Sequence, residues 1–561
     1  MLQKENIFKT RGTHKYTPKI FLIFCIYTTV SILFFFQTSF LNGKSYFGQG
    51  WDPYLYIWVF KWIPYAISHF ENPLVSPWAW VPYGLNITQA TTTPGLALIF
   101  WPLTSIFGPI LSFNIATLLT PALSATAVFA LCYEVTSKNI PSFIGGWIFG
   151  FSSYVIASLL GHAQVDFVAF LPLSLLMIVL YAKNKISFRT FTVLFTLTLI
   201  FQLLISLETF VTFTMMLGLF AVMHFLIFKN IQQIQKIVCH VFVSYLLTLI
   251  IMSPFIYYFF YDYSNMPHIL QNAAPFRIDL LNLIIPTDIT SLRYAKTHFT
   301  GNPSEQSGYI GIPLLLFTLF FSWRLWNKKE VRVLISILIL ALIFSFGERL
   351  NINGVATIPL PWLLIGKLPF IDNAIPARLM VYVFLCISLL LSIGLSQYVE
   401  KKYCIYLIGI LSIVPLLPRN HMNAKNSWWS TACPRSKLFS TNEYKRYIRK
   451  NDIVLFFPFG DVSDAIYWQV ITHAYFKTVN GYGNFIPSPL LKWTAIQMMV
   501  QNNPDSLQAG KQINLFAIHN NVQEVIMPKP FWKQWKPILL QAGWSDHIVG
   551  RFSVFTRTKH Q

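Results

Sequence analysis

Charged residues are scarce in this sequence. They make up 11% of the 561 residues, whereas a soluble globular domain carries about 25%. Hydrophobic residues account for 54% and aromatic residues for 17%. Much of the surface of such a chain must therefore meet lipid rather than water, which excludes an ordinary soluble protein and indicates an integral membrane protein.

Acidic residues are especially few. The chain has 21 Asp and Glu against 42 Lys and Arg, a formal net charge of +21. The basic residues lie in short clusters between apolar runs, and none forms the long Lys/Arg-rich tract of a nucleic-acid-binding arm. This distribution is typical of positive-inside topology signals and contacts with lipid headgroups.

Cysteine offers no framework. Only Cys433 lies in the region that we expect to face water, so no disulfide network can form there. The sequence has no CxxC pair and no zinc-ligand spacing. The other five cysteines fall inside apolar runs, where a free cysteine packs as a small hydrophobic residue: Cys25, Cys132, Cys239, Cys386 and Cys404.

Apolar runs dominate what is present. A helix needs about 20 apolar residues to cross a bilayer, and about eleven runs qualify: 19–38, 110–133, 140–160, 166–182, 188–206, 208–228, 237–260, 309–326, 331–347, 379–398 and 403–418. The run 93–107 is interrupted by Pro94 and Pro102, so we expect an interfacial or re-entrant helix there.

The basic clusters predict the topology. If 93–107 does not cross, every cluster between spans falls on the side of the basic N-terminus, as the positive-inside rule requires. We therefore expect a cytoplasmic N-terminus (1–18) leading into a retained signal anchor, and an extracytoplasmic C-terminus, in a bacterial inner membrane. The clusters lie at 183–189, 229–236, 324–332 and 401–402.

The expected fold is a polytopic α-helical membrane protein with a small extracytoplasmic α/β domain. The membrane domain covers 19–418 and includes a first extracytoplasmic loop, 39–109. In that loop the aromatic, amphipathic stretch 53–70 predicts a helix lying in the membrane interface. The C-terminal domain covers 419–561, where strand-like runs at 453–458, 522–527 and 552–557 alternate with helical stretches.

Asp52 is the first candidate functional residue. It follows the stretch 48–51 (Gly-Gln-Gly-Trp) and precedes Pro53, which suits a first helical turn. Asp52 is therefore expected to be either a helix N-cap or a carboxylate fixed at the outer membrane surface, available as a general base or metal ligand. The two roles are compatible, because a capping carboxylate is also a fixed one.

Three further polar residues lie in tight outer turns. His162 and Asp166 share the turn 161–166, and Glu208 lies in the turn 207–209. Such groups at the mouth of a helical bundle are costly unless they are paired or line a wet cavity. Ordinary capping is the alternative. We assign Asp166 to catalysis, and His162 and Glu208 to substrate binding.

Arg378 begins a span from the outer side. Snorkelling to headgroups is one fate of such a residue, and clamping a phosphate is the other, because guanidinium binds phosphate oxygens bidentately. Arg349 and Lys367 are the other outer cations near membrane ends. We expect all three to bind substrate.

The order of these features resembles a known family: a signal anchor, a long first outer loop with an acid near its start, a juxtamembrane helix and a tight Asp-containing turn. The chain resembles the bacterial integral-membrane glycosyltransferases of fold type C, and in particular their less characterised members. The stretches that carry the resemblance are Gly50-Trp51-Asp52-Pro53, Asn72-Pro73-Leu74, Tyr83-Gly84-Leu85-Asn86, Gly161-His162, Ile358-Pro359-Leu360-Pro361-Trp362, Ile375-Pro376-Ala377-Arg378, Phe457-Pro458-Phe459-Gly460 and Val479-Asn480-Gly481-Tyr482.

The resemblance implies transfer of a sugar from a polyprenyl-phosphate donor to an extracytoplasmic glycan, lipid or protein, with inversion at the anomeric carbon. Asp52 would take the proton of the acceptor hydroxyl, and the outer cations would stabilise the leaving phosphate. A divalent cation (Mg or Mn) bridging Asp52 or Asp166 to that phosphate would share the second role.

Two other classes stay open. Many members of the superfamily carry paired acids in the first loop, whereas Asp52 stands alone before Pro53. A non-catalytic membrane binding or assembly protein of the same fold is therefore one alternative. A transporter is the other, although a transporter would place charged groups near mid-membrane and interrupt its helices in a repeated pattern.

Overall fold

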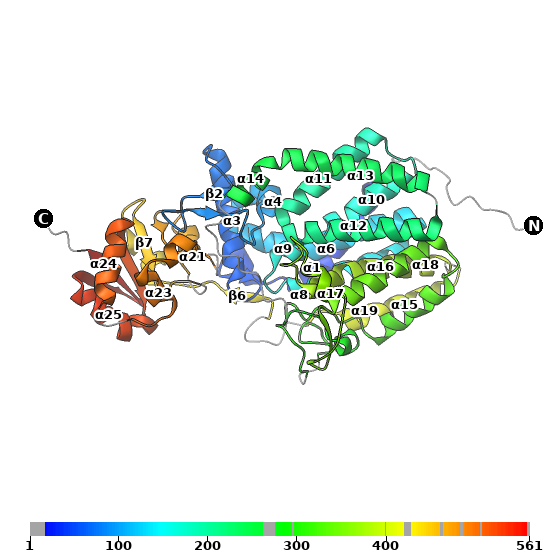
Figure 1. Cartoon of the computed structure of the whole chain (residues 1–561). Helices are drawn as coiled ribbons and strands as arrows, with labels where there is room; N and C mark the ends of the chain where they lie inside the picture. Colours follow the sequence, from blue (N-terminus) through cyan, green and yellow to red (C-terminus); the bar gives the residue numbers. More distant parts are fainter. Residues whose placement is uncertain are drawn as a thin grey trace, which may run out of the picture.

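The protein is elongated, with a helical membrane region at one end and a smaller α/β domain at the other (Figure 1). The computed structural model describes residues 17–229, 231–261, 275–293, 297–398, 400–419, 428–460, 464–482, 486–504 and 508–557. The predicted basic N-terminus lies almost wholly outside these residues. The predicted anchor coincides with the helix α1 (Thr17–Phe35).

The membrane region is confirmed as helical. Within the described residues, eight apolar helical segments are long enough to span a bilayer. They comprise α1, α6 (Pro109–Thr136), α7 with α8 (Asn139–Gly150, Ser153–Ser158), α9 with α10 (Ala163–Asp166, Phe170–Ala182), α11 (Phe188–Ile205), α12 (Leu207–Phe228), α13 (Ile231–Ile251) and α18 (Met380–Ser396). Three shorter helices coincide with the remaining predicted spans: α15 (Ile312–Arg324), α16 (Lys329–Ser345) and α19 (Lys402–Ile413). Eleven spans stays a prediction.

The run 93–107 forms two short helices, α4 (Pro94–Ile99) and α5 (Trp101–Phe107). Each carries its proline in the first turn, where the missing N–H leaves no hydrogen bond unmade. Helices of six and seven residues are roughly 10 Å long, far short of the bilayer core. The segment therefore does not cross as one helix, in agreement with the expectation from the prolines.

The first loop supplies α3 (Asp52–Ser68), preceded by α2 (Thr38–Leu41) and β1 (Ser45–Phe47) and followed by the two-residue strands β2 (Val75–Ser76) and β3 (Leu85–Asn86). The helix forms where it was predicted, but its expected exposure to the interface is wrong. Twelve of its 17 residues are buried. The helix contacts α4, α6 and the C-terminal domain, so protein covers most of it.

The C-terminal domain is a five-stranded mixed sheet in the order β10-β11-β9-β7-β8. Strands β7, β8 and β9 are parallel, whereas β11 pairs antiparallel with both β9 and β10. The three predicted strands are confirmed. The strands are β7 (Ile453–Phe456), β8 (Lys477–Thr478), β9 (Val522–Pro528), β10 (Trp544–Val549) and β11 (Phe552–Arg557), and the main helices are α21 (Ala465–Ile471), α23 (Thr494–Val500), α24 (Ala509–His519) and α25 (Trp532–Gln541).

The two domains share a packed junction. Strand β6 (Ser430–Ala432) pairs antiparallel with β1 of the first loop. On α3, the Trp58 indole N–H donates to Gln469 Oε1 of α21 at 3.0 Å. One continuous hydrophobic core contains residues of both domains. The first loop is therefore clamped between the membrane helices and the C-terminal sheet (Figure 1).

Candidate functional site

Asp52 opens α3. The structure places it at the first helical position, with Trp51 as the N-cap, so the expected capping role is wrong by one residue. A carboxylate in the first turn is still favoured by the helix dipole. Its side chain is 39% exposed, and its Oδ1 accepts a hydrogen bond from the Tyr482 hydroxyl of the C-terminal domain.

Close backbone contacts bring the turn 161–166 beside Asp52. The amide of Gln49 donates to the Leu160 carbonyl at 2.5 Å. Gly48 has φ +93°, and a Cβ there would lie 3.0 Å from the Leu160 carbonyl oxygen, so only glycine fits easily. One turn along α3, the Tyr56 hydroxyl donates to Gln164 Oε1. These contacts fix His162 relative to Asp52.

His162 is held in one tautomer. Its Nε2 lies 2.9 Å from Ser304 Oγ. The single hydroxyl proton of Ser304 is donated to Asn302 Oδ1 at 2.6 Å, and that oxygen also accepts the Glu305 amide. Because Ser304 has no second proton to donate, His162 Nε2 must carry the hydrogen and Nδ1 must carry a lone pair.

As a result, two hydrogen-bond acceptor atoms, one on His162 and one on Asp52, face each other. His162 Nδ1 lies 3.5 Å from Asp52 Oδ2. The nitrogen is buried and has no hydrogen-bond partner among the described residues. Neither atom has a proton to offer the other at neutral pH, so the pair is suited to receive a donor from outside, either an acceptor hydroxyl or a cation.

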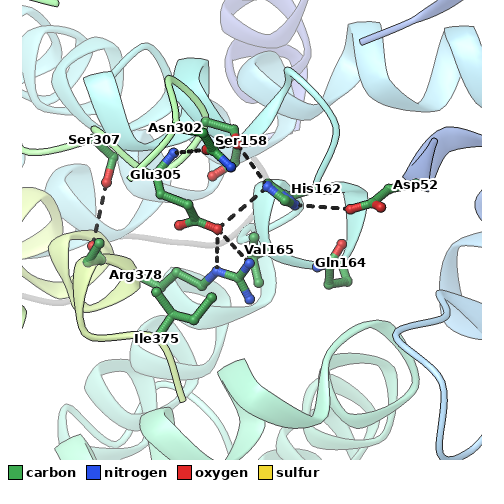
Figure 2. A network of polar contacts seen from close by, with 12 residues as sticks. Asp52, Ser158, His162, Gln164, Val165, Asn302, Glu305, Ser307, Ile375 and Arg378 are labelled. Atoms are coloured by element: carbon green, nitrogen blue, oxygen red, sulfur yellow. Dashed lines mark hydrogen bonds and ion pairs between the residues drawn. The ribbon is translucent and has the colours of Figure 1, made fainter. Parts of the chain in front are cut away.

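Behind His162 lies a buried ion-pair cluster (Figure 2). Arg378, 9% exposed, donates from Nε and Nη2 to Glu305 Oε1 at 3.2 and 2.6 Å. Its Nη1 donates to Glu208, whose other oxygen accepts the Ile375 amide at 2.8 Å. Glu305 Oε1 also lies 3.5 Å from His162 Nε2. The contacts therefore run from Asp52 through His162 and Glu305 to Arg378.

The other predicted residues lie outside this network. Asp166 is 1% exposed, and neither of its carboxylate oxygens has a hydrogen-bond partner among the described residues. Arg349 in β4 (Arg349–Ile352) and Lys367 after α17 (Trp362–Ile365) are exposed, and among the described residues no hydrogen bond or ion pair joins them to the cluster. The structure thus brings together Asp52, His162, Glu208 and Arg378, and leaves three candidates apart.

A metal ion would find a partial set of ligands. In the part of the chain that the structure describes, no three His, Cys, Asp or Glu side chains converge as a metal site. Asp52 Oδ2 and His162 Nδ1 nevertheless offer two donors to one point. Mg²⁺ commonly binds through one or two protein ligands, with substrate phosphates and water completing its shell, so this pair fits such an ion.

Two residues of the network, Glu305 and Tyr482, were not predicted from the sequence. Glu305 lies between the predicted spans 237–260 and 309–326, in a segment that also carries Asp262, Asp279 and Asp288, so the sequence did not distinguish it from these acids. Tyr482 belongs to the stretch 479–482, which carried the family resemblance but no charge. A neutral hydroxyl gives no comparable signal in a chain with 26 tyrosines.

Burial, assisted by the positive charge of Arg378 and opposed by Asp52, lowers the pKa of His162 to about 4. The unfolded chain binds a proton at this residue below about pH 6.5 and the folded chain does not, so stability falls as the pH drops from about 6.5 to 4. Between about pH 6.5 and 4 we therefore expect the free energy of unfolding of His162→Gln to fall by about 3 kcal/mol less than that of the wild type. Thermal unfolding of both proteins across that pH range measures it, and parallel curves would contradict the assignment.

Several solved structures are similar to this chain. The arabinofuranosyltransferase AftD from Mycobacteria matches 99% of this chain and 42% of its own, with 11% identity and a TM-score of 0.58. The archaeal oligosaccharyltransferase AglB from Archaeoglobus fulgidus, in complex with an inhibitory peptide and a dolichol-phosphate, matches 98% of this chain and 75% of its own (11% identity, TM-score 0.49). ArnT from Cupriavidus metallidurans matches 97% and 99% (11% identity, TM-score 0.48).

No protein-family model and no curated protein sequence matches the chain. The likeness to AftD, at 11% sequence identity, is a likeness of fold. This chain spans less than half of AftD's length. Together with the helical membrane region and the α/β C-terminal domain, the likeness shows that the chain has the type C glycosyltransferase fold that its sequence resembles.

Proposed function

We propose that the protein is a membrane glycosyltransferase that moves a sugar from a polyprenyl-phosphate donor to a hydroxyl group of an extracytoplasmic glycan, lipid or protein. One observation carries the proposal: Asp52 Oδ2 and the unprotonated His162 Nδ1 face each other at 3.5 Å at the start of α3. The fold, shared with an arabinofuranosyltransferase, supports the same reaction class.

Asp52 is the general base of this reaction. An acceptor hydroxyl that enters the gap donates its proton to Asp52 Oδ2 while its oxygen attacks the anomeric carbon. The bond from that carbon to the phosphate oxygen breaks, and the polyprenyl phosphate leaves with the bonding electrons. Attack from the face opposite the phosphate inverts the anomeric centre. Partial exposure of Asp52 leaves the carboxylate open to a large acceptor.

His162 and the ion-pair cluster orient the acceptor. With its proton on Nε2, the imidazole presents only a lone pair at Nδ1, so it accepts from a second hydroxyl of the acceptor and does not donate to Asp52. Ser304 and Glu305 hold this tautomer, and Arg378 holds Glu305. A fixed lone pair that holds this second hydroxyl beside the base keeps the reacting hydroxyl, whose proton goes to Asp52, in position at little entropic cost.

The leaving phosphate needs positive charge. Arg378 already faces two carboxylates, so we assign it to holding Glu305 rather than to clamping phosphate. Arg349 and Lys367 stay candidates for the lipid phosphate, because their side chains are not neutralised in this way. A divalent cation held by Asp52 and His162 would neutralise the phosphate charge.

The direct experiment supplies the purified protein in liposomes with a panel of polyprenyl-phosphate sugars and extracts of membrane glycans and lipids. We expect release of polyprenyl phosphate that depends on the acceptor extract, with the labelled sugar in the product. Saturable binding of a donor without any release of phosphate, across the panel, would favour the non-catalytic binding protein instead.

The orientation is a separate prediction. Single cysteines replace two exposed residues, Arg189 in the first turn of α11 and Lys437 in the C-terminal domain, in a background without the six native cysteines. An impermeant maleimide added to intact cells is expected to label position 437, whereas position 189 reacts only after permeabilisation. Labelling of both positions from one side would contradict the topology.

A further inference from the structure

Tyr482 reaches the candidate base from the other domain. It lies 430 residues after Asp52 in sequence, and its phenol O–H donates to Asp52 Oδ1. This direction of donation matters because Asp52 has no proton to give. The contact occupies one carboxylate oxygen and leaves Oδ2, which faces His162 Nδ1, for the acceptor.

The segment that carries Tyr482 is fastened to the first loop by a ladder of backbone hydrogen bonds. The Thr478 amide donates to the Trp78 carbonyl at 2.8 Å, and the Val81 amide donates to the Thr478 carbonyl at 3.1 Å. The Trp80 amide donates to the Asn480 carbonyl at 3.1 Å. Strand β8 thus runs on into a short pairing with residues 78–81.

A buried amide fixes the same segment to the C-terminal sheet. Asn480 is 1% exposed, and its Oδ1 accepts the Phe456 amide at 2.8 Å while its Nδ2 donates to the Phe456 carbonyl at 3.0 Å. Residue 481 packs on the Trp80 indole so closely that a Cβ there would overlap the ring. Glycine is therefore required directly before Tyr482.

We propose that Tyr482 is a positioning residue for Asp52, so that the sugar-transfer site is complete only when the C-terminal domain is docked on the first loop. The inference rests on the proposed function for its kinetic consequence, but the contact itself does not. The first loop, which alone would leave Asp52 free to rotate, gains from the C-terminal domain the donor that orients its carboxylate. A fixed orientation keeps Oδ2 directed toward the acceptor gap.

The first test is Tyr482→Phe, which keeps the ring and removes the hydroxyl. We expect turnover in the transfer assay to fall about 10- to 100-fold, the range that misplacement of a reacting group produces, with the KM for the donor within about twofold of wild type. Tyr467→Phe, in the same junction but facing Tyr54, is the matched control and should keep wild-type turnover. Wild-type turnover in Tyr482→Phe would overturn the proposal.

The second test separates positioning from general packing. Gly481→Ala must displace the segment from Trp80, and with it Tyr482. If Gly481→Ala slows transfer because Tyr482 no longer donates to Asp52, the double variant Gly481→Ala/Tyr482→Phe is no slower than Gly481→Ala alone. Multiplied effects in the double variant would show that the two residues act independently and would overturn the proposal.

A third measurement does not depend on activity. In protein labelled with 3-fluorotyrosine, the ¹⁹F resonance that disappears in Tyr482→Phe is expected to shift in Asp52→Asn and to stay in place in Glu71→Gln. A resonance that ignores Asp52→Asn would overturn the contact. If wild-type protein transfers no sugar yet the resonance shifts, the proposed function has failed while the docking contact stands.

Discussion

Asp52→Asn is expected to yield a protein that folds and inserts normally yet transfers sugar about 10²–10⁴-fold more slowly, the usual cost of losing a general base. The asparagine keeps Oδ1, which still accepts the Tyr482 hydroxyl. The amide group takes the place of Oδ2 and points an N–H at the His162 Nδ1 lone pair, 3.5 Å away in the wild type. The variant therefore fills the gap with its own donor and cannot accept the proton of a substrate.

Stability is the control for this variant. An added hydrogen bond to a buried nitrogen that has no partner among the described residues should leave the unfolding temperature unchanged or slightly raised. Glu71→Gln removes an acid from the loop after the same helix and should keep wild-type turnover and stability. Release of polyprenyl phosphate in liposomes is measured for the wild type, Asp52→Asn and Glu71→Gln. Wild-type rates in Asp52→Asn would remove Asp52 from the mechanism.

The membrane helices could be predicted from sequence because lipid imposes a simple requirement of about 20 apolar residues. The break in the run 93–107 could also be predicted, since Pro94 and Pro102 each lie in the first turn of a short helix. The surroundings of α3 could not be predicted. An aromatic stretch of this kind occurs both in helices that face lipid and in helices that protein covers. The segment that covers α3 lies far along the chain, as the Trp58–Gln469 contact shows.

For the site, the sequence indicated most of the residues but not the contacts between them. Scarcity of acids pointed to Asp52, His162's turn and Glu208, and position at a membrane end pointed to Arg378. Which of these touch one another depends on the packing of helices that are distant in sequence. Glu208 and Arg378 are 170 residues apart, yet they form an ion pair. Arg349 and Lys367 satisfied the same positional rule but lie exposed on the segment between α16 and α18.

Arg378→Met is expected to have the largest effect on stability. Two carboxylates contact this guanidinium, and Glu305 is only 5% exposed. Removal of the shared cation leaves both carboxylates in a poorly hydrated site without a cationic partner, which typically costs about 3–5 kcal/mol. Thermal unfolding in detergent, followed by fluorescence-detected chromatography, measures the loss. Arg324→Met, at the exposed end of α15, is the matched control and should change stability by less than about 0.5 kcal/mol.

A compensated variant shows whether the loss comes from the unpaired carboxylates. Arg378→Met/Glu208→Gln/Glu305→Gln removes all three charges together, so it leaves no uncompensated buried charge, which is the main cost of breaking a buried ion pair. We expect the triple variant to recover most of the unfolding temperature that Arg378→Met loses. Its turnover should stay low, because glutamine at 305 no longer places a negative charge 3.5 Å from His162 Nε2 and the tautomer that leaves Nδ1 free is held less firmly. A fully stable Arg378→Met protein with reduced donor binding would instead identify Arg378 as a phosphate clamp.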